Sequence, residues 1–515
     1  MTFVGEVLIL LACSAISYFI LNYRRQFSVK TIINNMPGPK TFPLIGSALY
    51  FLQCNPDDLL DLAVKLAKDY SSPLKFWMGN KLFIGIYEPD QIKTVLQSSV
   101  NKSIMYKMFE PVFGKGLITA PVSIWSKHRK IIAPSFNKSI LRKYFDIFVG
   151  QSLILTDELE KIELNGNKVI LLKHISKYTV RTACGTMTNV KPESLSNQIN
   201  RCIEVMKSFK KTLKLRLLNV FLYPNFIFNL TAWGQKQRQN KNSLVSFTNK
   251  LIQEQRYTNE EQRYTTNEEQ RYTTNEENTK SNHETRSSLL DILTDVFHED
   301  KFSQEKLHDN LITIIIAGFE TTSVTIDFAI FMLANFPEIQ EKLYKELWEI
   351  YGTKTSKSAP IKYEDLPHMN YLDCVIKETM RIFPVPAVMR QLTEDVKIGE
   401  FTLPKGTDVL LAIILAHRNE KYWPNPLVFD PDRFLPENRG ISYSSYYMPF
   451  SMGSRNCIGM NYAMISMKVV LVTLIRTFIF KVDKNIPIDK IKLNADITLS
   501  SVEPLEVKIE KRNVY

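Results

Sequence analysis

The sequence lacks the patterns that define several common classes of protein. Its six cysteines are scattered over 515 residues without a C-x-x-C pair or a regular spacing, which argues against a zinc or iron–sulfur site. No G-x-G-x-x-G follows a strand-like run, and no motif supports nucleic-acid binding. No break in composition divides the chain, so one large domain with an appendage is expected. The cysteine usage favours a reducing compartment, and the net charge of +12 is mostly a solvated surface.

The predicted appendage is the N-terminus. Residues 3–21 are almost wholly apolar, with Glu6 near the outer end, and Arg24 and Arg25 follow at once. At ~1.5 Å per residue this run nearly spans a hydrocarbon core of ~30 Å. The basic residues lie on its C-terminal side, which places the rest of the chain in the cytosol. Residues 1–22 are therefore predicted to be an uncleaved transmembrane anchor, and the alternative is a cleaved signal peptide.

The residues after the anchor predict a stiff linker and then the main domain. Residues 23–48 are basic and then proline-rich, and Pro37, Pro39 and Pro43 fix the backbone and remove donors. Residues 49–515 are predicted to be the catalytic domain.

A second apolar run, residues 311–334, is long enough to suggest another membrane span. Glu320 and Asp327 lie in its middle, and ionisable groups in lipid are costly, so a helix through the core of a soluble domain is expected. Ala317 and Gly318 remove side-chain bulk on one turn, which leaves room for a small ligand. Glu320 and Thr321 then place an acid beside an alcohol. The alternative for Thr321 is a hydroxyl that only bonds back to the carbonyl one turn earlier.

The most informative motif surrounds Cys457. The chain reads Phe450-Ser-Met-Gly453-Ser-Arg455-Asn-Cys457-Ile-Gly459, followed by a helix-like apolar run. The N–H groups at the start of a helix stabilise a thiolate, and glycines let the backbone come close to a flat macrocycle. A thiolate ligand on haem iron favours O–O cleavage. The alternative for Cys457 is a buried structural cysteine beside a glycine turn.

This segment matches F-x-x-G-x-R-x-C-x-G and resembles the haem-binding signature of the cytochrome P-450 family of haem-thiolate monooxygenases. The resemblance implies a mainly α fold with a small β region, preceded here by one transmembrane helix. It implies haem b with Cys457 as the axial iron ligand, and Phe450 and Gly459 beside the haem. Residues 317–322 resemble the family's [AG]-G-x-[DE]-T-[TS] oxygen-binding segment. Ala317 and Gly318 then contact haem, and Thr321 and Glu320 are the catalytic residues that handle dioxygen and protons.

The resemblance also implies partners for the haem propionates. Trp125 and Arg129 resemble a W-x-x-x-R that presents an indole N–H and a guanidinium one turn apart. Arg390 and Arg455 resemble the other propionate partners, since two partly buried carboxylates need cationic groups. Each arginine has the alternative of being an ordinary surface residue. Ala317 stands where many relatives have a glutamate that becomes ester-linked to haem, so non-covalent haem is expected.

Other side chains are expected to be structural. Glu378 and Arg381 lie one turn apart and resemble the family's E-x-x-R, a buried pair joined by an arginine from a later loop, here Arg433. These three residues are predicted to support the loop that leads to Cys457 without touching substrate. His128 is expected to be solvated and His417 structural, and no histidine has a haem-ligand motif.

Two further segments stand out. Residues 254–278 carry a near-perfect tandem repeat of about eight residues around Glu-Gln-Arg-Tyr-Thr, expected to be a flexible or fraying surface insertion. Residues 220–233 are aromatic and apolar. In the family the equivalent region roofs the substrate pocket and dips into the membrane, and the alternative is a buried core helix.

The resemblance predicts a monooxygenase that inserts one oxygen atom from O₂ into a lipophilic substrate: an endogenous lipid, a hormone or a xenobiotic. Electrons are expected from NADPH through a flavoprotein reductase, with cytochrome b5 as an optional second partner, and Lys127, Arg129 and Lys130 form a candidate docking face. The expected location is the cytosolic face of the endoplasmic reticulum (microsomal) membrane. The chain most resembles the clan that includes fatty-acid ω-hydroxylases and many insect members. Two alternatives stay open: a haem-thiolate isomerase or dehydratase, and a membrane-anchored haem- or ligand-binding protein without turnover.

Overall fold

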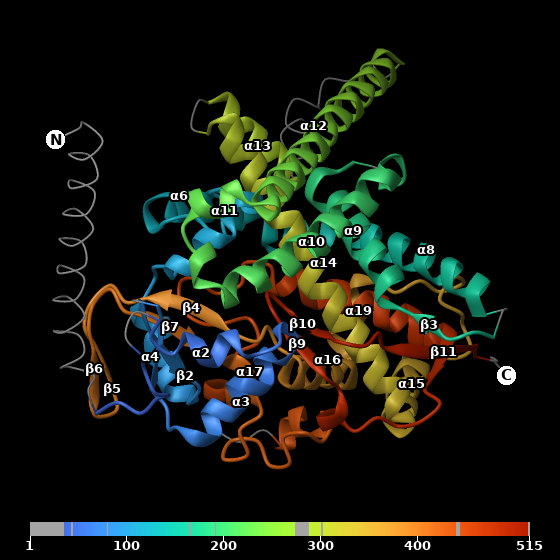
Figure 1. Cartoon of the computed structure of the whole chain (residues 1–515). Helices are drawn as coiled ribbons and strands as arrows, with labels where there is room; N and C mark the ends of the chain where they lie inside the picture. Colours follow the sequence, from blue (N-terminus) through green and yellow to red (C-terminus); the bar gives the residue numbers. More distant parts are fainter. Residues whose placement is uncertain are drawn as a thin grey trace.

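The computed structural model describes residues 35–42, 45–79, 81–163, 166–190, 192–272, 288–299, 302–438 and 443–512. The predicted anchor, residues 1–22, lies outside the described residues, as does the first part of the predicted linker. The described part is mainly helical with small β-sheets, as expected (Figure 1).

The helices carry most of the chain between the first sheet and the C-terminal strands. Their bounds are α2 Ala48–Leu52, α3 Leu59–Asp69, α4 Pro89–Ser98, α5 Glu110–Phe113, α6 Val122–Ile132, α7 Lys138–Lys143, α8 Phe145–Glu163, α9 Leu172–Thr188, α10 Ser196–Leu218, α11 Asn225–Leu230, α12 Ala232–Tyr272, α13 Leu289–His298, α14 Gln304–Asn335, α15 Pro337–Tyr351, α16 Asn370–Ile382, α17 Ile413–His417, α18 Tyr443–Tyr446 and α19 Met460–Thr477.

The strands form four small sheets. The largest has the order β1-β2-β7-β4, in which β2 and β7 are parallel and the other pairs antiparallel. A three-stranded sheet has the order β3-β11-β8, and β5-β6 and β9-β10 are hairpins. Their bounds are β1 Leu74–Met78, β2 Lys81–Ile86, β3 Val169–Ile170, β4 Val388–Gln391, β5 Val396–Ile398, β6 Phe401–Leu403, β7 Asp408–Leu411, β8 Phe478–Lys481, β9 Leu493–Ala495, β10 Leu499–Ser501 and β11 Glu506–Lys511.

Helix α14 forms the centre of the molecule and contacts α9, α12, α16 and α19 (Figure 1). In the described part of the chain it is the one helix long and apolar enough to cross a membrane by length and composition. However, 78% of its most apolar 18-residue stretch is buried inside the protein, which confirms the expected core helix. Burial raises the pKa of Asp327, in the middle of this helix, to about 7, which reflects the cost of a charged carboxylate in the folded core.

Two other segments can be compared with their predictions. Pro37 and Pro39 lie outside helices and strands beside the first sheet, where the Pro37 carbonyl accepts a hydrogen bond of 2.8 Å from the Lys75 N–H, and Pro43 lies outside the described residues. The first part of the repeat continues helix α12 as far as Tyr272, and this helix extends away from the body of the molecule (Figure 1). Residues 273–278 of the repeat lie outside the described residues.

Candidate functional site

A cavity of about 250 Å³ lies between α14 and the loop that leads into α19. Ala317, Gly318 and Thr321 line it from α14. Cys457 lines it from the opposite element, together with its neighbours Phe450 and Gly459. The structure therefore brings six of the predicted site residues to one mostly apolar cavity from segments more than 100 residues apart in the sequence.

The loop before α19 is folded so that the Cys457 side chain faces this cavity. The Cys457 N–H donates to the Phe450 carbonyl at 2.9 Å, which closes the loop. Gly453 has φ of +72°, and a Cβ there would lie 2.2 Å from the Leu96 carbonyl oxygen. Gly453 is thus required by the close approach of the loop to α4, and it does not line the cavity. At Gly459 a Cβ would meet only Phe136, at 3.8 Å.

Cys457 has the exposure that a ligand needs. Among the free cysteines of the described residues Cys457 is the exposed one, because it borders the cavity, while protein atoms surround its sulfur on the other sides. Burial raises the pKa of the Cys457 thiol above its usual value, although the Gly459 N–H and the Arg129 charge act in the opposite direction. A cation bound at the sulfur would act in the same direction as these two groups and stabilise the thiolate.

The side chains of Glu320 and Thr321 on α14 point in different directions. Thr321 lines the cavity, and its hydroxyl donates to the Ala317 carbonyl at 2.9 Å. Glu320 is 8% exposed and does not line the cavity; its carboxylate binds Lys210 Nζ at 2.5 Å and accepts from the Thr498 hydroxyl at 3.3 Å. The Glu320 carboxylate is held on the side of α14 away from the cavity by these two partners. Thr322, which the sequence did not single out, also lines the cavity, and its buried hydroxyl has no partner among the described residues.

Two buried arginines lie together without an acidic partner among the described residues. Arg455 Nη2 donates to the Ala120 carbonyl at 2.9 Å, but Nε and Nη1 are buried without partners, as is Nε of Arg390. Burial and, after it, the nearby Arg390 charge lower the pKa of Arg455 to about 10. The Arg455 guanidinium lies 4.2 Å from the centre of the Trp125 ring. Buried cations with unused donors require an anionic partner, and the two propionates of haem fit this requirement.

Lys102 and Tyr106 join these arginines and were missed by the sequence reasoning. Lys102 forms an isolated β-bridge with Arg390, and its Nζ lies 4.2 Å from the centre of the Tyr106 ring. Burial lowers the pKa of Lys102 to about 8, and the charges of Arg390 and Arg455 act in the same direction. Lys102 belongs to no motif, and in a chain with 65 lysines and arginines nothing marks it before folding.

Arg129 lies beside this cluster and is bound mainly to the cysteine loop. Its Nη1 donates to the Asn456 carbonyl at 3.0 Å, and its Nη2 donates to the Asn456 side-chain oxygen at 2.9 Å. The charge of Arg129 contributes to the lowered pKa of Arg455, so the two guanidinium groups are neighbours. The structure therefore places Arg129 where it positions the residue before Cys457.

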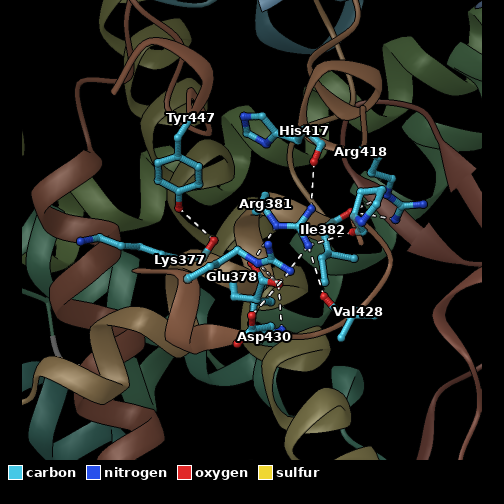
Figure 2. Close-up of polar contacts among 12 residues, drawn as sticks. Lys377, Glu378, Arg381, Ile382, His417, Arg418, Val428, Asp430 and Tyr447 are labelled. Carbon is cyan, nitrogen blue, oxygen red and sulfur yellow. Dashed lines mark hydrogen bonds and ion pairs between the residues drawn. The ribbon is translucent and has the colours of Figure 1, made fainter. Parts of the chain in front are cut away.

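The predicted scaffold of Glu378, Arg381 and Arg433 is confirmed (Figure 2). Glu378 and Arg381 have 0% exposed side chains, and Arg381 Nε and Nη2 donate to the Glu378 carboxylate at 2.7 and 2.9 Å. Arg433 Nε donates to the same carboxylate at 3.1 Å, as does the Asp430 N–H at 2.9 Å. None of these residues lines the cavity.

The histidines connect this scaffold to the site. Arg381 Nη1 donates to the His417 carbonyl at 2.9 Å, and the His417 ring accepts from the N–H of Met448, which lines the cavity. Burial and the Arg381 charge lower the pKa of His417 to about 3, so it is a neutral structural residue, as expected. His128, expected to be solvated, is 2% exposed and lies 3.1 Å from the Asn310 amide nitrogen; that expectation is wrong because α14 covers it.

The segment between α10 and α12 exposes apolar side chains. Phe221, Phe226 and Leu230 are 69%, 71% and 79% exposed, and Trp233 is 46% exposed. The alternative of a buried core helix is therefore wrong for this segment. Several large apolar side chains exposed on one short segment are typical of contact with a membrane or a partner.

The fold and the cavity define a mainly helical protein that presents a cysteine and paired cations to a flat anionic cofactor. The Cytochrome P450 family model matches residues 36–508. The chain is 32% identical over 505 residues to Cytochrome P450 4c21 of Blattella germanica, covering 96% of this chain and 97% of that protein. It is 29% identical over 520 residues to Cytochrome P450 4c3 of Drosophila melanogaster, with coverage of 99% and 95%, and 29% identical over 500 residues to Cytochrome P450 4V2 of Mus musculus, with coverage of 96% and 92%.

This chain belongs to the cytochrome P450 family. Its relatives include insect proteins, and they confirm the predicted resemblance to the clan that contains the fatty-acid ω-hydroxylases. The protein is accordingly a haem-thiolate monooxygenase that acts on lipophilic substrates and binds haem b non-covalently through a cysteine thiolate.

Proposed function

We propose that Cys457 would hold haem iron through its sulfur and that α14 would form the oxygen-binding wall of the same cavity. This proposal rests on one observation: Cys457 lies across a single apolar cavity from Ala317, Gly318 and Thr321. When bound, haem supplies the iron at which dioxygen is activated and one of its oxygen atoms is transferred to substrate. The unused donors of Arg390 and Arg455 hold the propionates, with Trp125, Lys102 and Tyr106 around them.

The protein's own residues supply protons and exclude water in this proposal. The Thr321 hydroxyl now donates its proton to the Ala317 carbonyl. By rotating it can instead point this proton into the cavity. Glu320 can relay a proton from water to Thr321 only after it leaves Lys210, because the ion pair keeps the carboxylate ionised and directs it away from the cavity. The side chains of Ile314, Phe383 and Met448 keep the remaining wall apolar.

Thr321→Ala is expected to lower the product formed per NADPH at least about fivefold while haem content stays unchanged. The reason is that electrons still arrive, but the hydroxyl that positions the proton is gone. The measurement compares NADPH consumption, product and hydrogen peroxide in one reaction. Thr325→Ala is the matched control, since Thr325 lines the same cavity one turn further along; an equal loss in both variants would contradict the assigned role.

The exposed apolar segment supports substrate entry from a lipid bilayer. In this proposal Phe226 and Leu230 insert among lipid chains, and residues 1–22 anchor the protein in the endoplasmic reticulum membrane with the catalytic domain in the cytosol. Electrons come from NADPH through a flavoprotein reductase, with cytochrome b5 as an optional second donor. Lys127 and Lys130 are exposed on α6, beside the Arg129 that binds the cysteine loop, and form part of the reductase docking face.

Phe226→Ser with Leu230→Ser is expected to weaken binding to phosphatidylcholine vesicles at least about tenfold, because each apolar side chain contributes about 1.5–3 kcal/mol when buried. The experiment uses protein without residues 1–22, so that the anchor does not mask the effect, and measures co-sedimentation. Trp348→Ser, at a 52% exposed position on α15, is the control and should change little. Unchanged sedimentation of the double variant would exclude this segment from the membrane contact.

The proposed reaction is tested with full-length protein, a flavoprotein reductase, NADPH and ¹⁸O₂. The substrates are a panel of fatty acids, terpenoids, steroids and plant toxins. A product that carries one ¹⁸O atom, formed only with NADPH, is the expected result. A product formed without NADPH would indicate an isomerase or dehydratase, and saturable binding of a substrate without any product would indicate a binding protein.

A further inference from the structure

A second cavity, of about 350 Å³, lies on the far side of Glu320 from the site. It is formed by α10, the short helix η1 (Pro56–Asp58) and the hairpin β9-β10. Four lysines line it, all from α10. They are Lys207, Lys210, Lys211 and Lys214.

The four lysines occupy one face of α10, because the spacing i, i+3, i+4, i+7 brings side chains together. Like charges four residues apart on a helix destabilise it, so this face carries a cost that the fold alone does not explain. Lys210 pairs with Glu320 and Lys214 pairs with Asp57, at 2.5 and 2.7 Å. Lys207 and Lys211 are exposed, and within the described ranges no ion pair holds either of them.

The negative charge of the carboxylates that line this cavity is smaller than the positive charge of its lysines. Asp57 and Asp496 are its two lining carboxylates, against four lining ammonium groups. Burial raises the pKa of Asp496 despite the pull of Lys210, and its side-chain oxygen is already bound by the Ile497 N–H at 2.6 Å. The Asn494 side chain contributes an amide that binds Lys214 at 2.7 Å. The lining thus leaves ammonium donors for a ligand.

We propose that this lysine-lined cavity binds an oxyanion, a phosphate group or one of the same chemistry, and that the bound anion competes with Glu320 for Lys210. Lys210 is the shared element, because its ammonium group lines the cavity and also holds the Glu320 carboxylate. An anion that draws Lys210 outward weakens the only ion pair recorded for Glu320 among the described residues. The consequence for turnover rests on the proposed proton role of Glu320, whereas anion binding itself does not.

Two sources supply such an anion: free inorganic phosphate, or the head group of an amphiphile whose tail lies along Leu215 and Pro56. The test is isothermal titration calorimetry on full-length holoenzyme in detergent, at constant ionic strength set with chloride. The probes are inorganic phosphate and decyl phosphate below its micelle concentration. If the two probes bind with equal affinity, the natural ligand of the cavity is a free anion. If decyl phosphate binds at least tenfold more tightly, the natural ligand is the head group of an amphiphile.

Lys207→Gln with Lys211→Gln is expected to weaken binding of the tighter probe at least about tenfold, because two unpaired charges are removed. Lys207→Arg with Lys211→Arg keeps the charges and should bind within about threefold of the unaltered protein. Lys173→Gln with Lys177→Gln, a pair of the same spacing on α9, is the matched control and should leave the affinity unchanged. Absence of saturable binding by either probe, or an equal loss in the α9 variant, would overturn the proposal.

The competition with Glu320 has its own measurement. Because coupling between two sites is reciprocal, Glu320→Gln should free Lys210 and tighten anion binding about fivefold. This readout needs no turnover, so it separates failure of the anion site from failure of the proposed catalytic role. An affinity that does not change in Glu320→Gln would overturn the competition.

Discussion

Glu378→Gln is expected to lower the free energy of unfolding by about 3–5 kcal/mol and to reduce the yield of folded holoenzyme severely. The amide keeps the shape of the side chain but removes the charge that two arginines share. Arg381 is completely buried and Arg433 is 13% exposed, so neither guanidinium gains water in compensation. The loss also reaches the site, since Arg381 holds the His417 carbonyl and His417 holds the Met448 N–H beside the cavity.

The matched control for this prediction is Glu364→Gln. Glu364 pairs with Arg142, and both side chains are at least 60% exposed. Exposed ion pairs contribute about 0–1 kcal/mol, so this variant should unfold close to the unaltered midpoint. The measurement is urea unfolding followed by tryptophan fluorescence and haem absorption. Similar urea midpoints for the two variants would show that the buried Glu378 ion pair stabilises the fold no more than the exposed Glu364 pair.

Arg455→Met and Arg390→Met are expected to accelerate haem dissociation about 10–100-fold each. A hydrogen bond to a charged group contributes about 1.5–3 kcal/mol, and each 1.4 kcal/mol corresponds to a factor of ten. The same substitutions should stabilise the haem-free protein, because a buried cation with unused donors is replaced by an apolar side chain of similar length. Faster loss of haem together with a more stable haem-free protein distinguishes a residue that contacts the cofactor from one that only supports the fold.

Arg476→Met is the control for the arginine variants. Arg476 is buried to the same degree as Arg455 and likewise lies over an aromatic ring, 3.7 Å from the centre of Tyr351. Its donors are used by backbone carbonyls far from the cavity, among them that of Ala359 at 3.0 Å. Its substitution should destabilise the fold and leave the dissociation rate unchanged. The rate is measured by transfer of haem to excess apomyoglobin, and an equal acceleration in all three variants would contradict the propionate assignment.

Those parts of the site that depend on short spacing could be predicted from the sequence. Cys457 with its flanking residues, and Ala317, Gly318 and Thr321, each lie within one loop or one helical turn, so the motif fixes their relative positions. The same holds for Glu378 and Arg381, which a helix places one above the other. The central helix was predictable because two carboxylates in an apolar run exclude a lipid environment.

The remaining features depend on contacts between distant segments. Lys102 joins Arg390 through a β-bridge, and Glu320 meets Lys210 from a helix 110 residues away. His128 is buried because Asn310 and Phe302 cover it. No local pattern encodes these pairings, because each is selected by the packing of whole elements. The parallel pairing of β2 with β7 was unpredictable for the same reason, since more than 300 residues separate the strands.

The ligation of haem by Cys457 is tested most directly by the ferrous–carbon monoxide spectrum of Cys457→Ala, with Cys54→Ala as the control. Cys54→Ala is expected to keep the long-wavelength absorption band typical of a thiolate ligand, whereas Cys457→Ala is expected to lose this band together with monooxygenase turnover. A Cys457→Ala protein that retains both the band and the turnover would contradict the account.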